Sequence, residues 1–169
     1  MYGDESGIGK MYDAVIKHTG NLIPEYIYCQ YYQEESMKFD LIKELNADHS
    51  ALVEMLKRIG AKGIIDDDTV KQLQEFRAAL IAHLQKEDRE FYPVMNKAAE
   101  TNPALAETLK VMGMEMEQLA DKALKMIDGW LAGLGSTSFA ADFQIFCSLL
   151  AARIKKEENS LYSRYLKLA

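Results

Sequence analysis

Apolar residues recur at steps of three and four along most of this chain, and no other feature restricts its fold as strongly. That spacing places apolar side chains on one face of an α-helix. Four such stripes lie between residues 39 and 168, and short segments with glycine or proline separate them. With only three prolines and few β-branched runs, the chain does not read as a β fold. The pattern predicts an all-α protein, an antiparallel up-down four-helix bundle.

Residues that favour helix ends bound the predicted helices. The first helix covers about residues 39–59, and Gly63 follows it as a helix-ending glycine. Acidic residues from Asp66 onward favour the start of the second helix. The apolar stripe of that helix runs as far as Val94, and we expect Pro93 to kink or end it. Asn102, which precedes a proline, is the predicted N-cap of the third helix.

Residues 1–38 differ from the rest of the chain. Residues 8–19 have the spacing of a short helix, and four tyrosines then surround Cys29. We expect a tyrosine-rich helical arm that either covers the bundle or binds a protein partner. The sequence thus predicts two parts, an N-terminal arm over residues 1–38 and a bundle over residues 39–169.

Composition excludes several classes of function. The chain has 20 Lys and Arg against 26 Asp and Glu, a net charge of −6, and no block of basic residues. We therefore expect no nucleic-acid and no membrane partner. Its two cysteines form neither a disulfide framework nor a zinc-finger spacing, and its three histidines cannot build a site of five imidazoles. The acidic N-terminus is no secretory signal, so we expect a cytoplasmic protein.

An eleven-residue pattern occurs twice in the chain. Residues 83–93 (HLQKEDREFYP) and residues 153–163 (RIKKEENSLYS) share Lys, Glu and Tyr at matching positions. The helix before each copy matches as well, since Asp48-His49 corresponds to Glu115-Met116. The repeat predicts two helical hairpins related by a pseudo-twofold axis.

Polar side chains interrupt the apolar stripes and mark a candidate site. They are His49, His83, Glu87, Arg153 and Glu157. His83 and Glu87 stand four residues apart, so both project from one face of their helix. Imidazoles and carboxylates that converge from several helices suit one non-haem iron, manganese or zinc ion with open positions for a small ligand. The alternative is a metal-free buried network in which Arg153 pairs with Glu87 or Glu157.

These residues resemble the hemerythrin-like family, the HHE cation-binding domain. The resemblance covers about residues 39–168 and rests on Asp48-His49, on the run His83-xxx-Glu87-Asp88-x-x-Phe91-Tyr92-Pro93, and on Glu157-Glu158-x-x-Leu161-Tyr162. Members of that family are four-helix bundles, often with a non-haem di-iron centre. They bind oxygen, sense redox conditions or nitric oxide, or handle iron.

The resemblance assigns four residues of this chain as metal ligands. His49, His83 and Glu87 stand at the ligand positions of the family's first hairpin. Glu157 keeps the carboxylate of the second hairpin. Together they imply a reduced site for a single metal ion.

The second hairpin lacks the family's imidazoles. Met116, preceded by Glu115, and Arg153 stand where histidines are expected. A thioether is a poor ligand for iron, and the charge of Arg153 opposes a nearby cation. We expect Arg153, Met116 and Glu115 beside the site, with Arg153 either behind the metal ligands or as the substitute for a metal.

Two functions follow from this reading, and both stay open at this point. The first is a hemerythrin-like cation-binding protein that senses or binds a small ligand such as dioxygen or nitric oxide. The alternative is a metal-free regulatory or protein-interaction module with a buried Arg-Glu network and no cofactor. An enzymatic role ranks third, because the residues indicate no substrate pocket.

Overall fold

The structure is a computed structural model that describes residues 25–133 and 138–168. The chain divides into two compact units, Met1–Lys38 and Phe39–Ala169, and each is described by itself. In the first unit, residues 25–38 are helical. The predicted helix over residues 8–19 and the surroundings of the arm's tyrosines lie outside the described residues.

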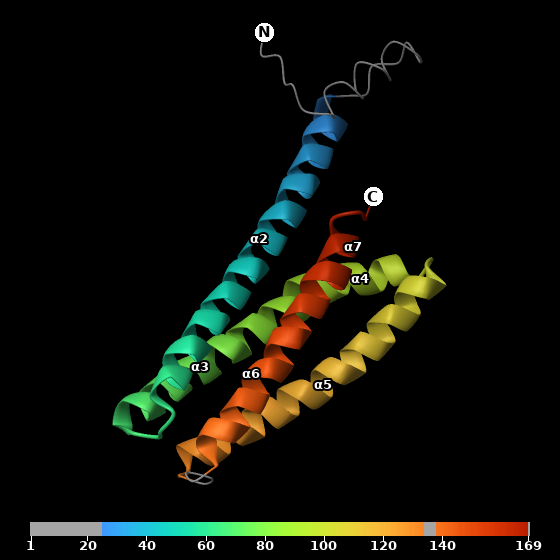
Figure 1. Cartoon of the computed structure of the whole chain (residues 1–169). Coiled ribbons are helices and arrows are strands. Elements are labelled where there is room, and N and C mark those ends of the chain that lie inside the picture. Colours follow the sequence, from blue (N-terminus) through green and yellow to red (C-terminus); the bar gives the residue numbers. More distant parts are fainter. Residues whose placement is uncertain (1–24, 134–137, 169) are drawn as a thin grey trace. The chain divides into compact units, whose positions relative to one another are not determined.

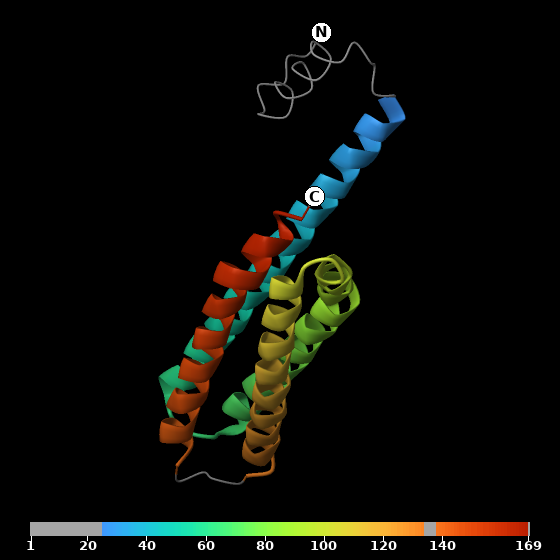
Figure 2. The same ribbon diagram turned by 90° about the vertical axis from the view of Figure 1, so that its right-hand side faces the viewer.

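Every regular element in the described part of the chain is helical. In chain order the elements are α2 (Glu25–Lys62), α3 (Asp67–Lys86), the π-helical η1 (Glu87–Phe91), α4 (Tyr92–Ala99), α5 (Pro103–Leu131), α6 (Phe139–Lys156), the π-helical η2 (Glu157–Tyr162) and α7 (Ser163–Tyr165). In the second unit they form four rods, α2 from Phe39 onward, α3–η1–α4, α5, and α6–η2–α7. Each rod runs antiparallel to the next (Figure 1 and Figure 2). The predicted all-α four-helix bundle is confirmed.

Side-chain caps explain where two of the rods begin. The carboxylate of Asp66 accepts a hydrogen bond from the backbone N–H of Thr69 at 2.8 Å, just before α3. This hydrogen bond, together with the ammonium group of Lys62, lowers the pKa of Asp66 to about 2. Asn102 accepts a hydrogen bond from the backbone N–H of Leu105 at 3.1 Å and begins α5. Both helices start where the sequence predicted.

Each copy of the sequence repeat contains a π-helical turn. η1 begins at Glu87 and η2 begins at Glu157, the matching glutamates of the two copies. A π turn holds one more residue than an α turn, so the buried face shifts by one position after it. Met95 is therefore fully buried, whereas Val94 is 37% exposed. The prediction of Val94 on the core face was wrong for this reason.

Pro93 does not end the second rod. It is the second residue of α4, which continues to Ala99. The π turn before Pro93 has already interrupted the regular hydrogen bonds of α3, so the missing N–H of proline costs little there.

The core of the bundle consists of two apolar clusters with a polar layer between them. One cluster includes Leu52, Leu56, Leu73, Phe76, Ile127, Phe143 and Phe146. The other includes Leu45, Phe91, Met95, Leu109, Leu161 and Tyr165. Five residues of the polar layer are buried: His49, His83, Glu87, Arg153 and Glu157. All but Arg153, which is flanked by Leu150 and Ile154 of the first cluster, fall between the two clusters along the chain. The layer is thus shielded from water at both ends by apolar side chains.

Among the described helices, none combines the length and the apolarity that a membrane span requires.

Candidate metal centre

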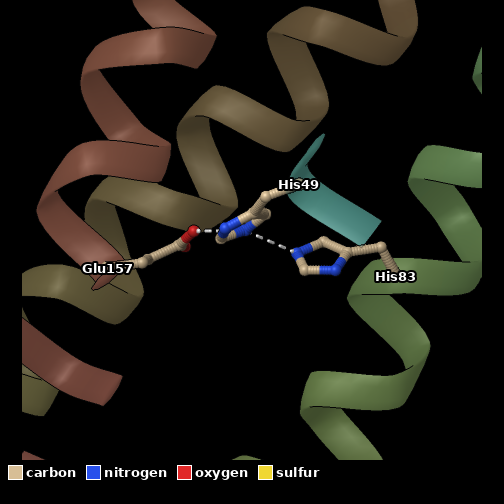
Figure 3. A group of neighbouring side chains, drawn as sticks. All are labelled: His49, His83 and Glu157. Atoms are coloured by element: carbon tan, nitrogen blue, oxygen red, sulfur yellow. Dashed lines mark hydrogen bonds and ion pairs between the residues drawn. The ribbon is translucent and has the colours of Figure 1, made fainter. Parts of the chain in front are cut away.

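Three ligand-type side chains from three rods meet in the polar layer (Figure 3). His49 on α2, His83 on α3 and Glu157 on η2 each offer a ligand atom, and these atoms lie within 4.8 Å of one another. The Nε2 atoms of the two imidazoles are 3.1 Å apart, and Glu157 Oε2 lies 3.3 Å from His49 Nε2. Atoms that bind one ion at about 2.1 Å on adjacent corners lie roughly 3.0–3.4 Å apart. The spacing therefore suits a single bound ion.

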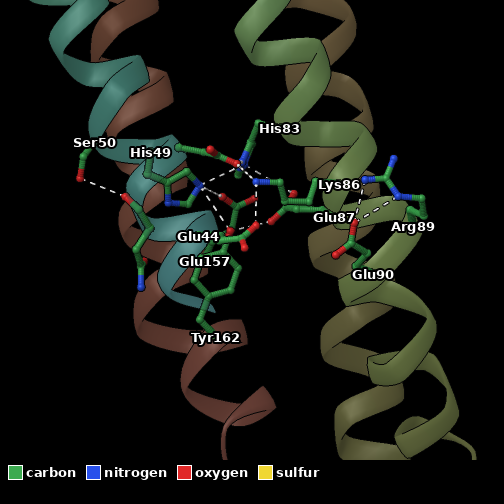
Figure 4. Close-up of polar contacts among 12 residues, drawn as sticks. Glu44, His49, Ser50, His83, Lys86, Glu87, Arg89, Glu90, Glu157 and Tyr162 are labelled. Atoms are coloured by element: carbon green, nitrogen blue, oxygen red, sulfur yellow. Dashed lines mark hydrogen bonds and ion pairs between the residues drawn. The ribbon is translucent and has the colours of Figure 1, made fainter. Parts of the chain in front are cut away.

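Glu87 adds a second carboxylate to this group (Figure 4). Its Oε2 lies 3.9 Å from His83 Nε2, and that oxygen is buried without a hydrogen-bond partner. Its Oε1 accepts a hydrogen bond from the hydroxyl of Tyr162 at 2.8 Å. The same hydroxyl lies 3.4 Å from His49 Nε2. A buried carboxylate oxygen without a partner is costly, and a bound cation removes that cost.

Carboxylates stand behind both imidazoles. Glu158 Oε1 lies 3.0 Å from His49 Nδ1, and Asp48 Oδ2 lies 3.7 Å from His83 Nδ1. Asp48 also accepts a hydrogen bond from Lys86 Nζ at 2.8 Å. A carboxylate behind an imidazole favours the proton on Nδ1 and leaves the lone pair of Nε2 for a metal. The contact at His49 is a hydrogen bond and favours Nε2 of that ring for a metal, whereas His83 Nδ1 is buried without a hydrogen-bond partner.

Arg153 lies on the other side of Glu157. Its Nε donates a hydrogen bond to Glu157 Oε1 at 2.6 Å, and its Nη1 donates to the backbone carbonyl of Met112 at 3.0 Å. Nη1 also lies 3.9 Å from Glu115 Oε2, and Lys156 forms an ion pair with that same carboxylate. Glu157 thus gives Oε1 to the guanidinium and turns Oε2 toward the imidazoles.

The two central carboxyls differ in their tendency to ionise. Burial, followed by the charge of Glu157, raises the pKa of Glu87 to about 7, and the hydrogen bond from Tyr162 offsets only part of this. Burial also opposes ionisation of Glu157, but hydrogen bonds from His49 and Arg153 outweigh it and lower the pKa of Glu157. Arg153 therefore neutralises one carboxylate of the layer, and Glu87 is the one that lacks a cation.

The two imidazoles also differ. Burial disfavours the charged form of His49, but hydrogen bonds to Glu157 and Glu158 outweigh burial and raise its pKa. Burial, together with the charge of His49, lowers the pKa of His83. His83 is thus the imidazole that more readily stays neutral, which is the form that binds a metal.

The structure buries five of the predicted residues in one layer, with Met116 and Glu115 outside it: His49, His83, Glu87, Arg153 and Glu157. Met116 is only half-buried on α5, and it lines a cavity with Glu87. Glu115 is exposed and pairs with Lys156, as a neighbour of Arg153. The assignment of His49, His83, Glu87 and Glu157 as metal ligands stays a prediction.

Sequence reasoning missed the role of two residues near the centre. Tyr162 contacts Glu87, and Glu158 contacts His49. Both occur in the second copy of the repeat, and Tyr162 matches Tyr92 of the first copy. The repeat therefore carried a signal for them, although it did not indicate their partners.

The family model of the hemerythrin HHE cation binding domain matches this chain over residues 40–165. The chain belongs to this family. The matched range contains both copies of the repeat and the whole polar layer of the hemerythrin domain. Among curated proteins and among solved structures, none matches the chain. The resemblance read from the sequence is confirmed, and the domain family is one that binds cations, typically iron.

The residues of this hemerythrin domain fit one metal ion better than two. The facing Nε2 atoms of His49 and His83 and the partnerless Oε2 of Glu87 surround a position that a cation satisfies. Beyond Glu157, the positive guanidinium of Arg153 stands where a second ion would lie against that carboxylate. Like charges at such short range repel strongly in a buried layer.

Proposed function

We propose that this hemerythrin-domain protein holds one divalent metal ion, iron in the first instance, between His49, His83, Glu87 and Glu157. The observation that carries the proposal is the pair of imidazole nitrogens 3.1 Å apart beside a buried carboxylate oxygen without a partner. Two imidazoles and two carboxylates are a ligand set that suits iron, manganese and zinc. In this role the bound ion supplies open coordination positions for a small ligand such as dioxygen or nitric oxide.

The contacts of Arg153 support a site that has lost the position for a second metal ion but keeps the position for the first. The guanidinium binds Glu157 Oε1, while Glu157 Oε2 stays directed at His49. The arginine thus supplies the positive charge that a second ion would bring, and it leaves the ligand oxygen of the first ion free. No hydrogen bond within the described residues links Arg153 to Glu87, so the charge of Glu87 still needs a cation.

We further propose that the site binds or senses a small ligand and does not turn over a substrate. Four protein ligands leave open positions on an iron ion, which prefers more than four. Tyr162, whose hydroxyl already reaches both Glu87 and His49, can position a polar ligand by hydrogen bonding. The apolar clusters above and below the layer limit access to small molecules.

Metal content is the direct test. Protein purified without oxygen, stripped of metal and titrated with Fe²⁺ or Co²⁺ should bind about one ion per chain. His83→Ala and Glu87→Gln should each lower affinity at least about tenfold. The matched control is His18→Ala, which removes the third histidine of the chain and should leave binding unchanged. Binding far below one ion per chain, or equal loss in the control, would contradict the proposal.

Ligand binding has its own readout. Nitric oxide added to the iron-loaded protein should change its electron paramagnetic resonance spectrum, and the change should be absent from the stripped protein. An iron-loaded protein whose spectra respond to neither dioxygen nor nitric oxide would leave metal binding in place and remove the sensing role.

A metal-free module is the second candidate, and the 2.6 Å bond between Arg153 and Glu157 favours it. In that role helix register is set by the buried network in which Arg153 also reaches the Met112 carbonyl on α5 and Glu157 reaches His49 on α2. The arm over residues 1–38 then binds a protein partner. This candidate predicts that stripped protein keeps its thermal stability and its partner binding. Deletion of residues 1–38 should then abolish partner binding while the bundle stays folded.

A further inference from the structure

A cavity of about 430 Å³ lies between α3–η1–α4 and α5. Its lining runs from exposed to buried residues. Asp88, Asn96 and Glu117 are exposed, Tyr92 and Met116 are half-buried, and Glu87 is 1% exposed. The cavity therefore leads from solvent to one carboxylate of the candidate metal centre.

Two of the residues with which α5 lines this cavity, Gly113 and Ala120, are small. The residues with which α5 lines the cavity are half-buried or exposed. They lie between Met112 and Ala123, which are both buried. Gly113 is one of them, and a Cβ added there would meet nothing within 4 Å. The space beside Gly113 is thus real room and not a gap closed by neighbouring side chains.

The chemistry of the lining favours a cation. Glu87, Asp88 and Glu117 contribute carboxylates, Asn96 and Tyr92 contribute neutral oxygens, and none of the residues that line the cavity is basic. The buried end of the cavity also favours a cation, because Glu87 Oε2 has no hydrogen-bond partner. Hard divalent cations prefer oxygen ligands, and acidic clefts attract them.

We propose that this cavity is the access route by which a divalent metal ion reaches the centre, with Asp88 and Glu117 attracting the ion and Glu87 receiving it. The inference rests on the proposed function, because it requires that the centre binds a metal. Glu87 is then both a ligand and the first residue of the centre that the ion meets.

A second groove, of about 400 Å³, serves as an internal comparison. It is lined by residues of α2, η2 and α7, among them Ser50, Glu158 and Tyr162. Its one carboxylate, Glu158, already partners His49 Nδ1, and the hydroxyl of Tyr162 already donates to Glu87. An ion that enters there finds no unengaged carboxylate, so the route on the α5 side is favoured.

Stopped-flow mixing of stripped protein with Co²⁺, followed by visible absorbance, tests the route. Asp88→Asn with Glu117→Gln should slow association about tenfold at low ionic strength and flatten its salt dependence. The matched control, Glu75→Gln with Glu107→Gln, removes the same net charge from exposed positions of α3 and α5 outside the lining. It should change the association rate less than about twofold.

A steric variant tests the same route without changing charge. Gly113→Leu fills the space beside α5, and it suits the helix better than glycine does, so the fold should persist. It should slow both association and dissociation about tenfold or more and leave Kd unchanged, because a blocked path affects both directions equally. Ser50→Leu in the second groove is the control and should alter neither rate.

The outcomes separate the route from the proposed function. Unchanged association rates in the charge and steric variants, with normal binding in the parent, would overturn the route alone. Slower association in Ser50→Leu but not in Gly113→Leu would assign uptake to the second groove. Absence of Co²⁺ binding by the parent protein would overturn both the route and the proposed metal centre.

Discussion

Arg153→Met is the substitution that best tests the electrostatic account of the polar layer. Methionine keeps an unbranched side chain that ends where the guanidinium of arginine begins, and it removes the charge and the hydrogen bonds. Arg153 is 5% exposed and Glu157 is 2% exposed, so the bond of 2.6 Å between them is shielded from water. The variant leaves Glu157 buried beside Glu87 with only His49 as an electrostatic partner.

The expected loss of stability is large. Breaking a buried ion pair from one side costs about 3–5 kcal/mol, because the remaining charge has lost both water and partner. For a domain of this size that loss lowers the melting temperature by roughly 6–20 °C. The double variant Arg153→Met with Glu157→Gln removes both charges, so it should recover most of the loss. Such a recovery would show that the unpaired carboxylate of Glu157, and not the lost packing of the arginine side chain, causes the loss of stability.

The effect should depend on pH in a defined direction. In the parent, Arg153 and His49 hold the pKa of Glu157 below its ordinary value of 4.5, so this contribution to stability is present above pH 4.5 and is lost as pH falls. In Arg153→Met, burial works without the guanidinium, and Glu157 takes up a proton more readily. The stability difference between parent and variant should therefore be largest near pH 8 and should shrink toward pH 5.

Urea unfolding of the stripped proteins, followed by circular dichroism at pH 8 and pH 5, measures these differences. Adding Fe²⁺ under nitrogen should restore part of the stability of Arg153→Met, since a cation again faces Glu157. If Arg153→Met lowers the free energy of unfolding by less than about 1 kcal/mol at pH 8, the reasoning is refuted, because an ion pair exposed at the surface contributes as much as that. A double variant as unstable as the single one would also refute it.

Three further substitutions test neighbouring features. Glu87→Gln should weaken metal binding yet stabilise the stripped protein at pH 8 by up to about 3 kcal/mol, because the pKa of this buried acid is raised to about 7 and its ionisation opposes folding above pH 4.5. In urea unfolding this gain in stability should vanish near pH 4.5, and a gain that is constant at all pH values would contradict the explanation. Tyr162→Phe removes the 2.8 Å hydrogen bond to Glu87 and should lower the free energy of unfolding by about 1–3 kcal/mol in the same assay. The loss should be smaller in the Glu87→Gln background, and an equal loss in both backgrounds would show that this hydrogen bond is not the cause. Asn102→Ala removes the N-cap of α5 and should cost about 1 kcal/mol, whereas Asn102→Asp should cost little; equal losses would contradict the capping role.

Local periodicity was enough to predict which helices form and which residues face inward. The steps of three and four place Leu45, His49 and Leu52 on one face of α2, and all three are buried. The same reasoning placed His83, Glu87, Arg153 and Glu157 in the core without any knowledge of their partners. Periodicity works here because helical geometry depends only on positions close in the chain.

The π turns show where local reasoning stops. The repeat indicated that Glu87 and Glu157 are equivalent, but α-helical spacing placed Val94 inward where Met95 is buried. The sequence pattern assumes one helical period throughout, whereas the rod changes its period at the glutamate. The pattern therefore could not predict which residues face the core after the π turn.

The pairing within the polar layer was decided by the tertiary structure. Tyr162 binds Glu87 across 75 positions of the chain, Glu158 binds His49 across 109, and Arg153 binds the carbonyl of Met112 across 41. The sequence left open whether Arg153 takes Glu87 or Glu157, and the structure shows Glu157. Such pairs depend on the relative rotation and register of packed helices, which a one-dimensional pattern does not contain.

The sequence by itself thus determined the bundle, its inward-facing histidines and glutamates, and the shortage of imidazoles in the second hairpin. Only the packed rods decided that Arg153 occupies one oxygen of Glu157 and leaves the other toward His49, and that Glu87 remains without a cation. The physical reason is that residue type and spacing set the face of a helix, whereas charge neutralisation depends on contacts of a few ångströms between helices.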